Sequence, residues 1–133
     1  FSLSVEELRA RAVPAWIASE MPLADEWLRS LQHEPKLWLR ARRGQGRALV
    51  RRLKHAKTPA AALPDAVLYE GREDLFQTAE FKEGEFEIQD IASQIVGLLC
   101  DPRPGETWWD ACAGEGGKLL HLSDLMENKG LMK

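Results

Sequence analysis

A glycine-rich turn separates an apolar run from an amphipathic helix near the end of this sequence, and this order of elements limits the folds open to it. The apolar run spans residues 107–111, the helix is predicted over 118–127, and the turn between them contains Gly114, Gly116 and Gly117. Glycines let a backbone approach a ligand closely, and a helix start offers unpaired N–H groups. The arrangement predicts an α/β fold with a ligand site at residues 110–118.

The spacing around this turn excludes one phosphate-binding motif and matches another incompletely. A P-loop requires Gly at the position of Cys112 and Ser or Thr at the position of Leu119. The dinucleotide fingerprint would use Gly114 and Gly116, but it requires Gly or Ala where Leu119 stands. A nucleoside triphosphatase is therefore disfavoured, and the ligand must be identified from other residues.

Charge is unevenly distributed along the 133 residues, although the formal net charge is only −3. The segment between Pro35 and Pro64 contains nine of the 18 Lys and Arg residues and no acid, while all 21 acids lie elsewhere. Such a segment is typical of a polyanion contact, and Trp38 offers an aromatic ring for stacking. The alternative is a solvated helix face. The predicted RNA-contact residues are Trp38, Arg40, Arg42, Arg43, Arg47, Arg51 and Lys54.

The remaining pattern predicts short elements. Ser4 and Glu7 match a capping box that begins a helix ending near residue 12, and prolines allow further helices over 14–20 and 22–31, with Trp16 and Trp27 packed between them. Strands are predicted at 37–42, 66–69 and 86–88, the second pairing with the first. A helix over 47–56, a helical turn over 74–79 and a helix over 91–99 capped by Asp90 complete the prediction.

Three stretches of the sequence resemble a known family. Residues 110–113 (Asp-Ala-Cys-Ala), 116–118 (Gly-Gly-Lys) and 121–122 (His-Leu) are similar to motif I of the RNA cytosine-C5 methyltransferases of the NOL1/NOP2/Sun type. Residues 84–94 resemble the segment that precedes motif I in those enzymes, and residues 37–42 with the basic helix resemble the start of their RNA-recognition subdomain. Residues 13–17 look like their N-terminal helical region.

The resemblance implies three parts of an α/β chain and two ligands. The parts are an N-terminal helical segment (1–35), a basic α+β RNA-recognition subdomain (36–83) and the start of a Rossmann-like domain (84–133). It implies that the loop binds S-adenosyl-L-methionine, that rRNA or tRNA is the substrate, and that Gln89 and Asp90 support the active site. The implied cofactor-binding residues are Asp110, Cys112, Ala113, Gly114, Glu115, Gly116, Gly117 and Lys118.

Two departures from the family concern the reaction. The chain has Gly114 and Glu115 where the family usually has Ala-Pro, which loosens the loop and adds a negative charge. Methylation at C5 of cytosine requires a thiolate that adds to C6, and the family's two catalytic cysteines come later than residue 133. Cys112 lies in the cofactor loop and Cys100 ends a helix, so no catalytic residue is assigned and the chain is expected to be inactive alone.

Other classes are disfavoured by composition. Two cysteines make no disulfide scaffold, no apolar run reaches membrane-spanning length, and no secretion signal is visible, so a cytoplasmic location is expected. His33, His55 and His121 lack metal-ligand spacing and are interpreted as structural or solvated. Two alternatives stay open: a non-enzymatic RNA-binding module using residues 36–57, and a partial domain whose open strand edge favours self-association.

Overall fold

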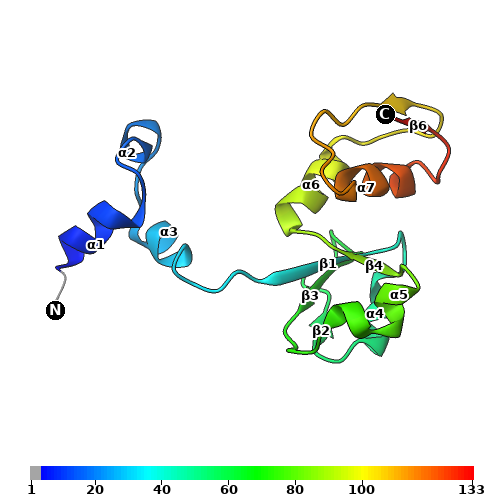
Figure 1. Ribbon diagram of the computed structural model, residues 1–133, viewed down its shortest axis with the longest axis horizontal. Coiled ribbons are helices and arrows are strands. Elements are labelled where there is room, and N and C mark those ends of the chain that lie inside the picture. Colours follow the sequence, from blue (N-terminus) through cyan, green and yellow to red (C-terminus); the bar gives the residue numbers. More distant parts are fainter. Residues whose placement is uncertain (1–3) are drawn as a thin grey trace. The chain divides into compact units, whose positions relative to one another are not determined.

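The computed structural model of this chain describes residues 4–133, which divide into two compact units at the junction of Pro35 and Lys36. No helix of the described residues is long and apolar enough to cross a membrane. The division falls where the sequence passes from its N-terminal helices into the basic segment. The elements are labelled in Figure 1.

The first unit contains three short helices: α1 (Val5–Ala12), α2 (Ile17–Glu20) and α3 (Asp25–Ser30). The capping box is confirmed, since the Ser4 hydroxyl accepts from the Glu7 amide at 3.1 Å and the Glu7 carboxylate accepts from the Ser4 amide at 2.9 Å. The prediction that Trp16 packs in a core is wrong, because its side chain is 63% exposed, while Leu28 is buried.

The second unit is built on a four-stranded antiparallel sheet in the order β2-β3-β1-β4. Its strands are β1 (Leu37–Ala41), β2 (Ala56–Lys57), β3 (Ala66–Tyr69) and β4 (Phe86–Ile88). The predicted pairing of β1 with β3 is confirmed, with Leu39 opposite Val67. Strand β4 pairs with the other edge of β1, so the sheet continues past the domain boundary expected after residue 83.

One face of this sheet is covered by α4 (Gly46–Arg52), the 3-10 helix η1 (Leu75–Gln77) and α5 (Ala79–Lys82). The alternating pattern of β1 places Leu39 and Ala41 in this core, which also includes Leu49 and Val67. Helix α4 ends earlier than predicted, because His55 has a positive φ of 62° and Ala56 pairs with Tyr69 in the sheet. Of the apolar residues that predicted one continuous helix, Leu49 lies in α4, Leu53 is its C-cap and Ala56 lies in β2.

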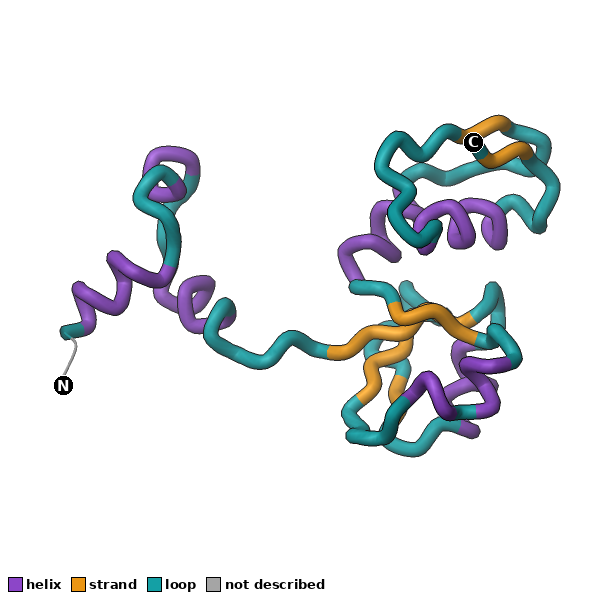
Figure 2. The backbone as a smooth tube through the Cα atoms, viewed as in Figure 1, coloured by secondary structure: helices purple, strands orange, loops and turns teal. Residues whose placement is uncertain are grey.

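The opposite face of the sheet is covered by α6 (Ile91–Leu99) and α7 (Gly117–Leu125), as Figure 1 shows. Strand β5 (Thr107–Trp108) precedes α7, and β6 (Leu131–Met132) follows it and pairs with β5 in parallel. Figure 2 shows these two short strands beside the helices of this layer. The predicted order of strand, glycine-rich turn and helix is confirmed, and β5-α7-β6 is the β-α-β unit from which α/β folds are built.

Candidate functional site

The loop between β5 and α7 is a tight turn built on an aspartate and two glycines. Asp110 accepts a hydrogen bond from the Cys112 amide at its Oδ1 (3.0 Å), and the Gly116 amide donates to the Ala113 carbonyl at 2.8 Å. Gly114 and Gly116 have φ values of 55° and 84°, in the left-handed region that side chains disfavour. The glycines therefore set the path of the backbone from the strand into the helix.

The start of helix α7 is open on its outer side. Gly116 is the N-cap, and no side chain among residues 4–133 caps the helix. A Cβ added to Gly114 or Gly116 would meet no atom within 4 Å, so the space above both glycines is free. The unpaired N–H groups of a first helical turn attract anionic groups. Cys112 and Glu115 are exposed, whereas Ala113 and Lys118 are half-buried.

A pocket lies beside this loop. Its walls come from the loop and from helices α6 and α7, and they include Trp108, Asp110, Cys112 and Lys118. The second carboxylate oxygen of Asp110, Oδ2, is buried and has no hydrogen-bond partner among the described residues. Trp109, the residue after β5, is 77% exposed, while Trp108 within the strand is half-buried. The pocket is thus lined by an aspartate and a lysine next to the uncapped start of α7.

The two residues predicted to support the site lie between β4 and α6. Asp90 is the N-cap of α6, and its Oδ1 accepts from the Ala92 amide at 2.8 Å. Gln89 is 7% exposed, and its Oε1 accepts from Nε of Arg40 at 2.7 Å. Its Nε2 lies 3.6 Å from where a Cβ on Gly117 would be. The side chain of Gln89 therefore lies beside the first residue of α7, whereas Asp90 has a capping role.

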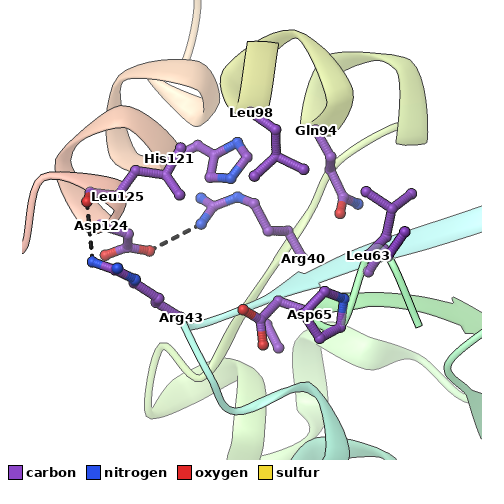
Figure 3. Close-up of a pocket in the computed structure, with 13 residues that line it drawn as sticks. Arg40, Arg43, Leu63, Asp65, Gln94, Leu98, His121, Asp124 and Leu125 are labelled. Atoms are coloured by element: carbon purple, nitrogen blue, oxygen red, sulfur yellow. Dashed lines mark hydrogen bonds and ion pairs between the residues drawn. The ribbon is translucent and has the colours of Figure 1, made fainter. Parts of the chain in front are cut away.

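The structure corrects the expectation that Arg40 contacts RNA, as Figure 3 shows. Arg40 is only 2% exposed, because α6 and α7 cover the face of β1 on which it lies. Its Nη1 donates to Oδ2 of Asp124 at 2.9 Å. Burial lowers the pKa of Arg40, and the hydrogen bond with Asp124 opposes that shift. Removing one partner of such a buried pair costs about 3–5 kcal/mol.

The neighbouring arginines of the predicted RNA-contact set also bond to α7. Arg42 donates from Nε to the Gly84 carbonyl (2.7 Å) and from Nη1 to Asp124 (3.1 Å). Arg43 is exposed, and its Nη1 donates to the Leu125 carbonyl at 3.1 Å. The first part of the basic segment therefore holds helix α7 against the sheet.

The later part of the basic segment remains on the surface. Arg47, Arg51 and Lys54 are exposed, and none of them forms an ion pair with a residue that the structure describes. Trp38 is half-buried on β1. These cations stand at and just beyond α4, the helix on the far side of the sheet from α7. They form a positive surface separate from the buried arginine.

Two residues of α7 have roles that sequence reasoning did not assign. Asp124 is the common acceptor of Arg40 and Arg42. His121 is 7% exposed, and burial, with a smaller contribution from Arg40, lowers its pKa to about 4. Their partners lie more than 80 residues earlier in the chain or on α6, so no local spacing signals them. Among residues 4–133, no cluster of three or more His, Cys, Asp or Glu side chains could hold a metal ion.

Comparison with known proteins gives relatives that are named as ribosomal RNA methyltransferases. No family model matches the chain. The ribosomal RNA small subunit methyltransferase B of Shewanella oneidensis is 34% identical over 122 residues, which are 84% of this chain and 28% of that protein. The corresponding Xylella fastidiosa protein is 31% identical over 84% of this chain. The 28S rRNA (cytosine-C5)-methyltransferase of Mus musculus is 32% identical over 51% of it.

Two solved structures share the fold. A crystal structure titled PH0851 matches 98% of this chain with a TM-score of 0.77 and 26% identity, and the match covers 32% of that chain. A methyltransferase homologue from Pyrococcus horikoshii matches 98% of this chain with a TM-score of 0.72 and 21% identity. The chain spans about a tenth to three tenths of the length of the first curated relatives it matches. The resemblance in the motifs is thus confirmed: over that part of their length, this chain is a relative of the RNA cytosine-C5 methyltransferases of the NOL1/NOP2/Sun type.

Proposed function

We propose that this chain is the part of an S-adenosylmethionine-dependent rRNA cytosine-C5 methyltransferase that contacts RNA and holds one end of the cofactor. The observation that carries the proposal is the open loop at residues 110–118, which combines a motif I sequence with an uncapped helix start. The relatives named as rRNA methyltransferases favour rRNA over tRNA as the substrate class. The cytoplasmic location expected from the sequence stays a prediction.

The groups around the loop fit the methionine end of this cofactor. That end carries an ammonium and a carboxylate, so it requires a hydrogen-bond acceptor and cationic or N–H donors. The unpartnered Oδ2 of Asp110 would accept from the ammonium. Lys118 and the first amides of α7 would hold the carboxylate. The free space above Gly114 and Gly116 would admit the ligand, which supplies a methyl group on a sulfonium sulfur.

The loop residues have different roles in this proposal. Cys112, Ala113, Gly114, Gly116 and Gly117 would line the ligand as small groups or backbone, and Gln89 would support the loop from behind. Glu115 is exposed and adds a negative charge at the same edge. Cys112 has no assigned nucleophilic role, because the cofactor loop is not where the target base must be attacked. We expect no methyl transfer by this chain alone.

Arg47, Arg51 and Lys54 would bind RNA through its phosphates. Arg42 and Arg43 would add to this surface only through those N–H donors that are not bonded to α7. Arg40 is excluded from this set by its burial. Trp38 would stack on a base with the part of its ring that stays accessible. The substrate surface and the cofactor loop would therefore lie on separate elements of one unit.

A second candidate function is a non-enzymatic RNA-binding module, which the exposed cations of α4 favour by themselves. The two functions differ in what the loop does. In the module, residues 110–118 are only a turn, and the Asp110 carboxylate only orders it.

Amide chemical shifts in the presence of S-adenosylmethionine separate the two functions. The methyltransferase proposal expects the cofactor to shift the amides of residues 110–118 while those of β2 and β3 stay in place. RNA should shift amides of α4 instead. Shifts with RNA and none in the loop at millimolar cofactor would support the module and contradict the cofactor site.

A further inference from the structure

A set of buried polar side chains joins the sheet to helix α7, and we call it the junction network. Its members come from β1, from the segment after β4, from α6 and from α7, and all of them except the one after β4 line a small pocket (Figure 3). The members are Arg40, Gln89, Gln94, His121 and Asp124. None of them except Gln89 belongs to the cofactor set proposed above, so the network requires its own explanation.

Arg40 fixes the orientation of the Gln89 side chain. An arginine has only donors, so the group that faces its Nε must be the amide oxygen of Gln89, at 2.7 Å. The amide nitrogen of Gln89 must then point to the other side. A second bond, from Nε2 of Gln94 to the Gln89 carbonyl at 2.8 Å, holds the backbone of the same residue. Gln89 is thereby held at both its backbone and its side chain.

The free side of the Gln89 amide faces the start of α7. A Cβ built on Gly117 would lie 3.6 Å from its Nε2, so the amide nitrogen lies beside this glycine with space for a methyl group between them. Gly117 is the first residue of the helix and follows the N-cap Gly116. The orientation that Arg40 imposes therefore places the amide nitrogen of Gln89 beside the residue at which the cofactor loop becomes a helix.

The far end of α7 is held by the same arginine. Asp124 accepts from Arg40 at 2.9 Å and from Arg42 at 3.1 Å. Between the two ends, His121 packs against Gly97 of α6 so closely that a Cβ on Gly97 would lie 2.2 Å from Nδ1. Nδ1 of His121 and Nη2 of Arg40 are both buried without partners among the described residues. Rotation of α7 about its axis would break these contacts.

We propose that Arg40 is a positioning residue for the cofactor loop, which acts through Gln89 at the start of α7 and through Asp124 near its end. The predicted effect of Arg40 on cofactor binding rests on the proposed function. Its predicted effect on the conformation of the loop does not depend on that function. It assigns a different role to the residue that the charge pattern places among the RNA contacts. Arg40 then affects cofactor affinity and leaves RNA affinity unchanged, the opposite of a phosphate-binding arginine.

The test compares two variants with one control in the whole chain. Arg40→Lys keeps a positive charge that can reach Asp124 but removes the Nε donor to Gln89. Gln89→Met keeps the length of the side chain, removes its amide and leaves the Arg40–Asp124 pair in place. Arg52→Lys is the control, because Arg52 is exposed, pairs with Glu85 and belongs to α4, the helix on the sheet face opposite α7.

The first readout is hydrogen exchange at the Leu120 amide, which donates to Gly116 at 2.9 Å and closes the first turn of α7. Arg40→Lys and Gln89→Met should each speed this exchange about tenfold, with little change at the amides of β3, whereas Arg52→Lys should change neither. If exchange becomes equally faster at Leu120 of α7 and at the amides of β3, Arg40 and Gln89 have a merely structural role and the proposal is overturned. Unchanged exchange at Leu120 in Gln89→Met overturns it as well.

The second readout is affinity, measured with S-adenosylmethionine and with a cytosine-containing RNA hairpin. Both variants should weaken cofactor binding about five- to tenfold and change RNA binding less than about twofold. Weakened RNA binding with unchanged cofactor binding in Arg40→Lys overturns the inference. Absence of cofactor binding in the unmodified chain contradicts the proposed function instead, and the exchange at Leu120 then decides whether Arg40 positions the loop.

Discussion

Gly97 of α6 and His121 of α7 pack so closely that a Cβ on the glycine would lie 2.2 Å from Nδ1 of the imidazole. Two non-bonded atoms cannot lie this close together. The imidazole that occupies the space belongs to a residue only 7% exposed, so it is itself enclosed by other atoms. The two helices are therefore matched at this point, with a residue that has no side chain opposite a large one. This match sets how near α7 can lie to α6.

The Gly97→Ala substitution tests this match. In an ordinary helix the change stabilises by up to about 1 kcal/mol. Here the new methyl group must displace His121, so we expect a net loss of about 1–3 kcal/mol in the free energy of unfolding. Urea denaturation measures the change. In a His121→Ala background the same substitution should become neutral or stabilising, and an equal loss in both backgrounds would contradict the packing described.

His121 should make the stability of the second unit depend on pH. Its pKa in the fold is about 4, below the ordinary value of 6.5, so between these values the unfolded chain binds more protons than the folded one. Stability should therefore be fully present above about pH 6.5 and fall as the pH approaches 4. The contribution should be about 1–2 kcal/mol, since the full shift is reduced by solvent screening near the surface.

A His121→Gln variant isolates this contribution, because glutamine does not titrate. The difference between the two pH profiles, measured by urea denaturation at a series of pH values, removes the effect of the many carboxylates that titrate near pH 4. The charged groups near the imidazole are Arg40, Asp124 and Asp65, and all three are present in both proteins. Parallel profiles would show that His121 is not a buried neutral residue.

Reversal of the exposed cations tests the RNA surface. The triple variant Arg47→Glu, Arg51→Glu and Lys54→Glu should reduce RNA affinity at least about tenfold and lower the slope of log K against log salt by up to about three. Fluorescence anisotropy with a labelled RNA hairpin over a series of salt concentrations measures both quantities. The matched control reverses three cations outside the basic segment, namely Arg11, Arg29 and Arg72, which are also exposed. An equal loss in both triple variants would mean that net charge, and not this surface, binds RNA.

The sequence was sufficient to predict elements whose determinants are local. The turn from β5 into α7 follows from its glycines, and the caps at Ser4 and Asp90 follow from their neighbours. The strand over 37–42 was also predicted, and in the structure Leu39 and Ala41 lie on its core face and Arg40 on the other. Sequence reasoning did not show that this second face is covered as well.

The burial of Arg40 could not be predicted, because the residues that bury it are distant in the sequence. Gln89 lies 49 residues after Arg40, and Asp124 lies 84 residues after it. The charge pattern treats every cation of the basic segment as exposed to solvent. Only the packing of α6 and α7 against the sheet shows which of these cations are buried. The end of α4 was misplaced for a related reason, since Ala56 is held by pairing with Tyr69 and not by the helix before it.

Cofactor binding at the loop is the central claim, and calorimetric titration of S-adenosylmethionine into two glycine variants tests it most directly. Gly116→Val places a branched side chain on the N-cap of α7, where φ is 84° and the space above is open. Gly105→Val has the same backbone strain at a φ of 91°, with no atom within 4 Å of its Cβ, and lies outside the loop. We predict that the unmodified chain and Gly105→Val bind the cofactor and that Gly116→Val does not. Equal binding by both variants, or no binding by the unmodified chain at millimolar cofactor, would contradict the account.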